Sequence, residues 1–173
     1  MTAEQEILNN LRDIPDFPKK GIIFKDITPL LSNAEAFNTV IKNFADEFKG
    51  KGITKIVGIE SRGFIFGSAL AHEMGIGLVL VRKKGKLPYK TISASFALEY
   101  GTDTLQIHSD ALNSNDKVVI IDDLLATGGT MNAAIELVQK LGASVHCCAF
   151  VCELGFLNGR EKVKAPVKIL ATL

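Results

Sequence analysis

Residues 118–130 form the run Val118-Val119-Ile120-Ile121-Asp122-Asp123-Leu124-Leu125-Ala126-Thr127-Gly128-Gly129-Thr130. The four β-branched residues predict a strand buried on both faces, and the small residues after the acids open onto a helical pattern. Gly128 and Gly129 let backbone amides approach an anion, and a helix N-terminus adds unpaired N–H groups and partial positive charge. Thr127 and Thr130 add hydroxyl donors. The run therefore predicts a phosphate-binding loop, because loops that follow strands in α/β sheets lie at the ligand-binding edge.

The two acids before this loop narrow the choice of ligand. The loop lacks the lysine of a Walker loop, and the chain has no G-x-G-x-x-G dinucleotide fingerprint. Asp122 and Asp123 would repel a second phosphate, but their oxygens can accept hydrogen bonds from the two hydroxyls of a ribose. A glycine-rich turn beside solvated surface acids is the alternative interpretation.

Strand and helix patterns alternate on the N-terminal side of the run and continue through it. The predicted strand and helix units are Lys55–Ile59 with Phe64–Met74 and Val118–Ile121 with Thr130–Leu141, and Leu78–Val81 is a further strand. Strands separated by helices imply parallel crossovers and a sheet covered on both faces. Gly75 and Gly142 stand where helices commonly end. The expected fold class is therefore α/β.

The remaining segments depart from this alternation. A short helix with Ile7, Leu8 and Leu11 precedes a proline-punctuated segment, Ile14–Pro29. Ser32 and Glu35 have the spacing of a capping box, and the helix after them has an apolar stripe at Phe37, Val40, Ile41, Phe44 and Phe48 before Gly50. Between Lys90 and Ile107 the apolar period falls to two, which predicts an antiparallel excursion of the kind that often forms a lid or flap.

Composition excludes several classes of protein. The 173 residues suit one domain. The 20 basic and 19 acidic residues give a net charge of +1, so no overall electrostatic field favours binding to nucleic acid or to membranes. No signal-peptide core or membrane-length apolar run occurs, which predicts a cytoplasmic protein.

Cys147, Cys148 and Cys152 form no C-x-x-C pair. We expect core thiols in a reducing compartment rather than disulfides or a metal site.

The run from Asp122 to Thr130 resembles the signature of the type I phosphoribosyltransferases. This resemblance implies a parallel sheet flanked by helices, with a small N-terminal hood and a β flap, and phosphoribosyl diphosphate as the donor. It also implies that Asp122 and Asp123 bind the ribose hydroxyls. The 5-phosphate would be bound by Ala126, Thr127, Gly128, Gly129 and Thr130.

The diphosphate of such a donor carries heavy negative charge, and two more loops offer cations. Glu60-Ser61-Arg62-Gly63-Phe64 follows a strand and opens a helix, so Arg62 is either a bidentate phosphate ligand or part of a surface ion pair. Arg82, Lys83, Lys84, Lys86 and Lys90 follow the next strand, with Gly85 among them. Such a run is usually a solvated face or a nucleic-acid patch. Because this run accompanies the phosphate loop, we assign Arg62, Lys83 and Lys86 to the diphosphate.

Further motifs resemble the adenine phosphoribosyltransferases, in the same order and over nearly the full chain. They are Phe17 to Asp26, Glu60 to Phe64, Arg82 to Pro88, Leu98 to Gly101 and the Asp122 loop. The resemblance implies a hood of about residues 1–30 in which Ile23, Phe24 and Lys25 bind the base, although Phe24 could equally be a core residue. It also implies a flap of about residues 82–108, in which Glu99 is the catalytic carboxylate and Tyr100 accompanies it. Some members carry Arg where this chain has Lys25, a change that leaves backbone recognition of the base intact.

The reaction implied by this resemblance is purine salvage, in which adenine and phosphoribosyl diphosphate give AMP and diphosphate. The resemblance also implies a homodimer of a single domain spanning residues 1–173. Mg²⁺ would be bound mainly through the donor's oxygens and water, so no metal cage of protein ligands is expected. Two alternatives stay open. The base could be hypoxanthine, guanine, xanthine or a pyrimidine, or the chain could be a non-catalytic sensor of phosphoribosyl diphosphate.

Overall fold

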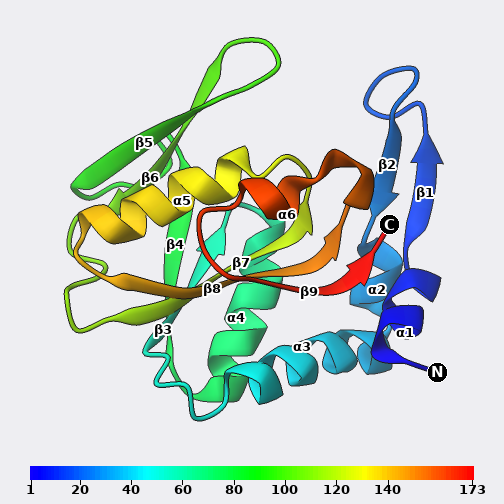
Figure 1. Cartoon of the computed structure of the whole chain (residues 1–173), viewed down its shortest axis with the longest axis horizontal. Coiled ribbons are helices and arrows are strands. Elements are labelled where there is room, and N and C mark those ends of the chain that lie inside the picture. Colours follow the sequence, from blue (N-terminus) through cyan, green and yellow to red (C-terminus); the bar gives the residue numbers. More distant parts are fainter.

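A seven-stranded sheet forms the centre of the computed structural model, which describes residues 1–173 (Figure 1). Its strands, in spatial order, are β5 (Thr91–Ala97), β6 (Thr102–His108), β4 (Gly77–Lys83), β3 (Lys55–Ile59), β7 (Lys117–Leu125), β8 (Ser144–Glu153) and β9 (Val167–Thr172). The strands β4, β3, β7, β8 and β9 pair in parallel. In contrast, β6 pairs antiparallel with β4, and β5 pairs antiparallel with β6. The predicted α/β class and the antiparallel excursion are both confirmed.

Helices and a small second sheet surround this centre. The helices are α1 (Ala3–Asn9), α2 (Thr28–Ser32), α3 (Ala34–Phe48), α4 (Arg62–Met74), α5 (Gly129–Lys140) and α6 (Gly159–Lys162), with a 3-10 turn η1 (Gly155–Leu157). The antiparallel pair β1 (Arg12–Pro15) and β2 (Ile23–Asp26) stands beside the main sheet (Figure 1). None of the helices has both the length and the apolar character that a bilayer span requires.

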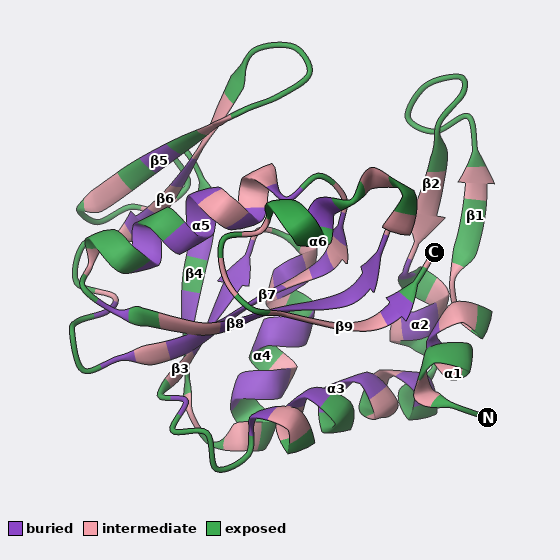
Figure 2. Cartoon of the chain, viewed as in Figure 1, coloured by how far each residue is buried: buried purple, intermediate pink, exposed green.

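Most residues of β7 and β8 are buried (Figure 2), and their side chains divide between core clusters on the two faces of the main sheet. Val119 and Ile121 join a core cluster with side chains of α3 and α4, whereas Val118 and Ile120 join a second cluster with side chains of α5. Successive side chains of a strand point to opposite faces, so these four residues reach two different cores. The prediction of a strand buried on both faces is confirmed.

Several predicted boundaries differ from the structure. The Ser32 capping box is wrong, because Ser32 closes α2 and Asn33 caps α3 by accepting hydrogen bonds from the amides of Glu35 (3.1 Å) and Ala36 (3.2 Å). Leu11 lies beyond the end of α1 and packs against the core from outside that helix. Helix α4 begins two residues before the predicted start, at Arg62, and β7 continues through the two acids to Leu125.

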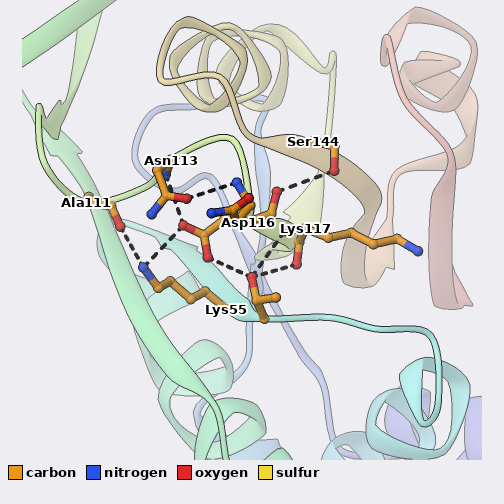
Figure 3. Close-up of polar contacts among 8 residues, drawn as sticks. Lys55, Ala111, Asn113, Asp116, Lys117 and Ser144 are labelled. Atoms are coloured by element: carbon orange, nitrogen blue, oxygen red, sulfur yellow. Dashed lines mark hydrogen bonds and ion pairs between the residues drawn. The ribbon is translucent and has the colours of Figure 1, made fainter.

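A buried carboxylate organises the edge of the sheet where the parallel strands begin (Figure 3). Asp116 precedes β7, and its side chain accepts hydrogen bonds from the Thr54 hydroxyl (2.8 Å) and the Asn113 amide (3.0 Å). Lys55 Nζ lies 3.4 Å from the same carboxylate, and the Ser144 amide donates to the Asp116 carbonyl at 3.0 Å. Burial alone would raise the pKa of Asp116, but the hydrogen bonds lower it below its ordinary value. The network thereby joins the starts of β3, β7 and β8.

Candidate functional site

Two adjoining cavities lie at the opposite edge of the sheet, where β3, β4 and β7 end. The larger cavity, of about 660 Å³, is lined by Glu60, Ser61, Arg62, Lys83, Lys86, Asp122, Asp123, Leu124 and Ala126. The smaller, of about 90 Å³, is lined by Asp122, Leu124, Leu125, Ala126, Thr127, Gly128, Gly129, Thr130, Met131 and Phe150. The predicted phosphate loop, acidic pair and cations therefore meet at one site, because parallel strands end at a common edge.

The small cavity is shaped by the transition from β7 into α5. Gly128 is the N-cap of α5 with a φ of +88°, a backbone conformation that side chains rarely tolerate. No side chain caps the helix, so the amides of its first turn are free to bind an external acceptor. The helix dipole adds partial positive charge at the same point. This end of the site can therefore hold a single phosphate.

The acidic pair lies between the two cavities. Asp123 is only 4% exposed and forms an ion pair with Arg62, whose Nε lies 2.8 Å from the carboxylate. Asp122 accepts a hydrogen bond of 2.9 Å from the Asp123 amide. Burial, and then repulsion from the Asp123 charge, raise the pKa of Asp122 well above its ordinary value. Burying two adjacent carboxylates costs free energy unless their oxygens accept hydrogen bonds. Hydroxyl groups of a ligand can supply those hydrogen bonds.

Arg62 connects the acidic pair to the N-terminal hairpin. Its guanidinium carbon lies 5.3 Å from the centre of the Phe24 ring, within cation–π range. The ion pair, which the sequence left as an alternative role for Arg62, is formed with Asp123. The Arg62 side chain also lines the larger cavity and keeps about two-fifths of its surface exposed, at 39%. An anion in that cavity can therefore still reach the guanidinium.

The basic loop after β4 is fixed by a carboxylate to which the sequence assigned no role. Glu60 pairs with Arg82 Nη2 at 3.1 Å and accepts the Lys83 amide at 2.9 Å. Burial alone would raise the pKa of Glu60, but the bonds from Arg82 and Lys83 lower it below its ordinary value. Arg82 also donates to the Lys86 carbonyl at 3.3 Å. These contacts set the backbone path that brings Lys83 and Lys86 to the cavity wall.

The predicted base-binding residues lie in strand β2. Ile23 is 59% exposed, and the Phe24 ring packs edge-on against Phe17 with 5.1 Å between centroids. Lys25 is held by Asp13 of β1, with Nζ 2.7 Å from the carboxylate. Phe24 is therefore not a core residue. Its ring lies beside the guanidinium of Arg62, a residue that lines the larger cavity.

The predicted catalytic residues Glu99 and Tyr100 lie in the turn between β5 and β6. Both are exposed, and neither lines either cavity. The end of β5 nevertheless reaches the phosphate loop, since a Cβ added to Gly129 would lie 3.6 Å from a ring carbon of Phe96. The last residues of β5 therefore lie beside the phosphate loop, while Glu99 and Tyr100 in the turn that follows are exposed (Figure 1).

Comparison with known proteins agrees with this arrangement. Residues 26–172 match the phosphoribosyl transferase domain family. The chain belongs to this family. It is 57% identical to the adenine phosphoribosyltransferase of Syntrophotalea carbinolica over 92% of this chain and 93% of that protein. The crystal structure of adenine phosphoribosyltransferase from Rhodothermus marinus superposes with a TM-score of 0.94 at 48% identity, covering 99% of this chain and 98% of that one.

A further family member was crystallised with ligands. The adenine phosphoribosyltransferase of Saccharomyces cerevisiae, complexed with adenine and an imino-altritol bisphosphate, superposes with a TM-score of 0.92 at 42% identity. The alignment covers 97% of this chain and 98% of the yeast protein. This phosphoribosyl transferase fold is therefore shared along essentially the whole chain.

Sequence reasoning missed Gly63 as a residue that shapes the site. A Cβ at Gly63 would lie 2.7 Å from the Ile121 carbonyl oxygen and 3.1 Å from Asp122 Oδ1, so only glycine lets α4 approach β7 this closely. The only available signal was its place directly after Arg62 in the strand-to-helix turn. That position alone does not reveal the carbonyl group that the glycine faces.

Proposed function

We propose that this chain transfers 5-phosphoribosyl from phosphoribosyl diphosphate to adenine, giving AMP and diphosphate. The observation that carries the proposal is the pair of joined cavities, in which a single-phosphate loop, an acidic pair and three cationic side chains line one continuous site. High identity to proteins named adenine phosphoribosyltransferase supports adenine as the base. The direct test is Mg²⁺-dependent formation of AMP, with hypoxanthine, guanine and xanthine as competing bases. AMP formation that any of these bases suppresses at equal concentration would contradict the assignment of adenine.

Each part of the donor has a group of residues suited to it. The amides and hydroxyls of Ala126, Thr127, Gly128, Gly129 and Thr130 would bind the 5-phosphate. Asp122 and Asp123 would accept hydrogen bonds from the ribose hydroxyls, and Arg62, Lys83 and Lys86 would bind the diphosphate. As the anomeric bond breaks, positive charge develops on the ribose ring and negative charge on the leaving group. The three cations are placed to stabilise the second of these charges.

We also assign the hairpin β1–β2 to a hood over the base and the hairpin β5–β6 to a flap. Phe24 offers an aromatic face for a purine, while the backbone of Ile23 and Lys25 can read the edge of the base. Closure of the flap would bring Glu99 and Tyr100 to the reacting atoms and exclude water that competes with the base. The position of the Phe96 ring beside Gly129 supports a flap whose turn lies close to the phosphate loop.

We propose Mg²⁺ as the metal that accompanies the donor. Asp122 and Asp123 supply the oxygen atoms that Mg²⁺ prefers, while the described residues form no cluster of potential metal ligands. The ion would therefore be held mainly by the donor's oxygens and by water, and when bound it would neutralise charge on the leaving diphosphate.

Two properties of the whole protein complete the proposal. Leu78 and Leu80 lie on the same face of β4 and are each more than one-third exposed, an apolar surface that supports assembly as a homodimer. The three cysteines are unpaired and buried, which supports a reducing, cytoplasmic location.

Arg62→Ala is expected to weaken binding of phosphoribosyl diphosphate by about tenfold, because a charge-assisted hydrogen bond to the donor is lost. Turnover at saturating donor should fall much less. Calorimetry with the donor and Mg²⁺ measures the affinity, and Lys42→Ala, an exposed position on α3, is the matched control. Wild-type affinity in the Arg62 variant would remove this residue from the diphosphate site.

AMP binding is expected to strengthen as pH rises through the raised pKa of Asp122. Ribose hydroxyls donate to an ionised carboxylate, so the ligand favours the deprotonated form and releases a proton when it binds. Calorimetry in buffers of different ionisation enthalpy counts that proton. Asp122→Asn should bind AMP more weakly and show no such release. Proton uptake by the wild-type chain, or equal release from the Asn variant, would contradict the assignment.

A further inference from the structure

The phosphate loop rests on a second element, helix α6, to which the proposed chemistry assigns no role. Gly159 begins α6, and a Cβ at this position would overlap the carbonyl oxygen of Ala126. The same Cβ would lie 3.1 Å from Leu125 Cγ. The backbone of α6 therefore lies directly against the first residue of the phosphate loop, closer than any side chain would permit.

A second contact lies at the tightest point of the loop. A Cβ added to Gly128 would meet Val163 Cγ2 at 3.2 Å and the Gly159 carbonyl oxygen at 3.3 Å. The left-handed residue that starts α5 is thus enclosed by both ends of α6. Ala126 and Gly128 directly precede the first turn of α5, whose amides carry no side-chain cap, so α6 packs against the segment that leads into these amides.

Two sets of polar contacts hold α6 in place. Arg160 donates to both oxygens of Glu153 at the end of β8, with Nη2 at 2.5 Å and Nε at 3.3 Å. This guanidinium, more than any other contact, lowers the pKa of the buried Glu153 carboxyl below its ordinary value. From the other side, Asn132 of α5 donates to the Lys162 carbonyl at 2.8 Å and accepts the Lys164 amide at 2.9 Å. The helix is therefore bonded to β8 and to α5 at once.

We infer that α6 is a positioning element for the 5-phosphate loop, with Gly159 and Arg160 as its determining residues. The inference rests on the proposed function, because the loop is taken to bind the donor's 5-phosphate. Backbone amides bind phosphate only when several of them converge, and the contacts at Ala126 and Gly128 fix the path of the chain that leads into the first turn of α5. Displacing α6 should turn these amides away from the phosphate while leaving the diphosphate end of the site intact.

The decisive variant is Gly159→Ala, which must push α6 away from Ala126. We expect the affinity for AMP and for ribose 5-phosphate to fall by about tenfold or more, since small displacements of positioned groups are costly. Affinity for magnesium diphosphate, which tests the other end of the site, should stay within about twofold. In the reaction, the KM for the donor should rise more than kcat falls. A general loss of structure would weaken both ligands alike, so the ratio of the two affinities identifies positioning.

A second variant keeps the inference testable if Gly159→Ala does not fold. Arg160→Met removes the bond to Glu153 without adding bulk at the loop, and Arg160→Lys should restore part of the lost AMP affinity. The control is Glu161→Gln, an exposed neighbour on the same helix. Unchanged AMP affinity in a folded Gly159 variant or in Arg160→Met would overturn the inference alone. A wild-type chain that binds neither AMP nor ribose 5-phosphate would overturn the proposed function, and the inference with it.

Discussion

Glu99→Ala is expected to lower kcat by about a hundredfold or more, a typical loss when a positioned acid or base is removed. The affinity for phosphoribosyl diphosphate should change by less than about threefold, because Glu99 lines neither cavity and stands exposed at the tip of the hairpin. Only closure of the flap would bring the carboxylate to the base and the ribose, so its contribution belongs to the transition state. Steady-state kinetics combined with calorimetry separates the two quantities.

Two companion variants sharpen this test. Glu99→Gln keeps the size of the side chain and removes its charge, so it should be nearly as slow as the alanine variant whether Glu99 exchanges a proton or stabilises positive charge. Tyr100→Phe changes the neighbouring residue, which is 82% exposed, and should retain most of the turnover if the Tyr100 hydroxyl takes no part in the chemistry. Turnover within about twofold of wild type in both Glu99 variants would remove this residue from the mechanism.

Sequence predicts best the helices and strands whose hydrophobic pattern lies within one short run of residues. Strand β3 occupies the predicted span Lys55–Ile59, and α4 and α5 lie within two residues of their predicted bounds. Strands β8 and β9 received no assignment, because an apolar run around Cys147 and Cys148 is equally compatible with a buried helix until its partners are known. The pairing of β8 with β7 and of β9 with β8 is a non-local property.

The same distinction applies to the site. Asp122, Arg62 and Lys83 could be placed together because each follows a parallel strand, and such strands end at one edge. The contact of Phe24 with Arg62 and the close approach of Gly159 to Ala126 join segments far apart in the chain. No local pattern encodes these distances. Sequence therefore identifies the groups that can touch a substrate, and the structure identifies the residues that hold those groups.

Asp116→Ala is expected to lower the free energy of unfolding by about 3 kcal/mol, the scale of breaking a buried and hydrogen-bonded charge pair. The change removes the acceptor for Thr54, Lys55 and the Asn113 amide in the network of Figure 3. Urea unfolding measures the loss, and Asp110→Ala, an exposed aspartate nearby in the chain, should change stability by less than about 0.5 kcal/mol. A loss in the Asp116 variant no larger than in that control would contradict the assigned role.

The effect of Asp116 should also depend on pH in a defined direction. Because the folded state lowers the pKa of this carboxyl, its stabilising contribution is present above the unfolded value of about 3.8 and is lost as pH falls through the folded value. The difference in stability between wild type and Asp116→Asn should therefore shrink on acidification. AMP affinity of the variant should remain close to wild type, since Asp116 lies at the end of β7 opposite to the acidic pair, about 20 Å away by the rise of a strand. An Asp116 variant that lost AMP affinity but kept wild-type stability would contradict the assignment of Asp116 to stability and of the acidic pair to binding.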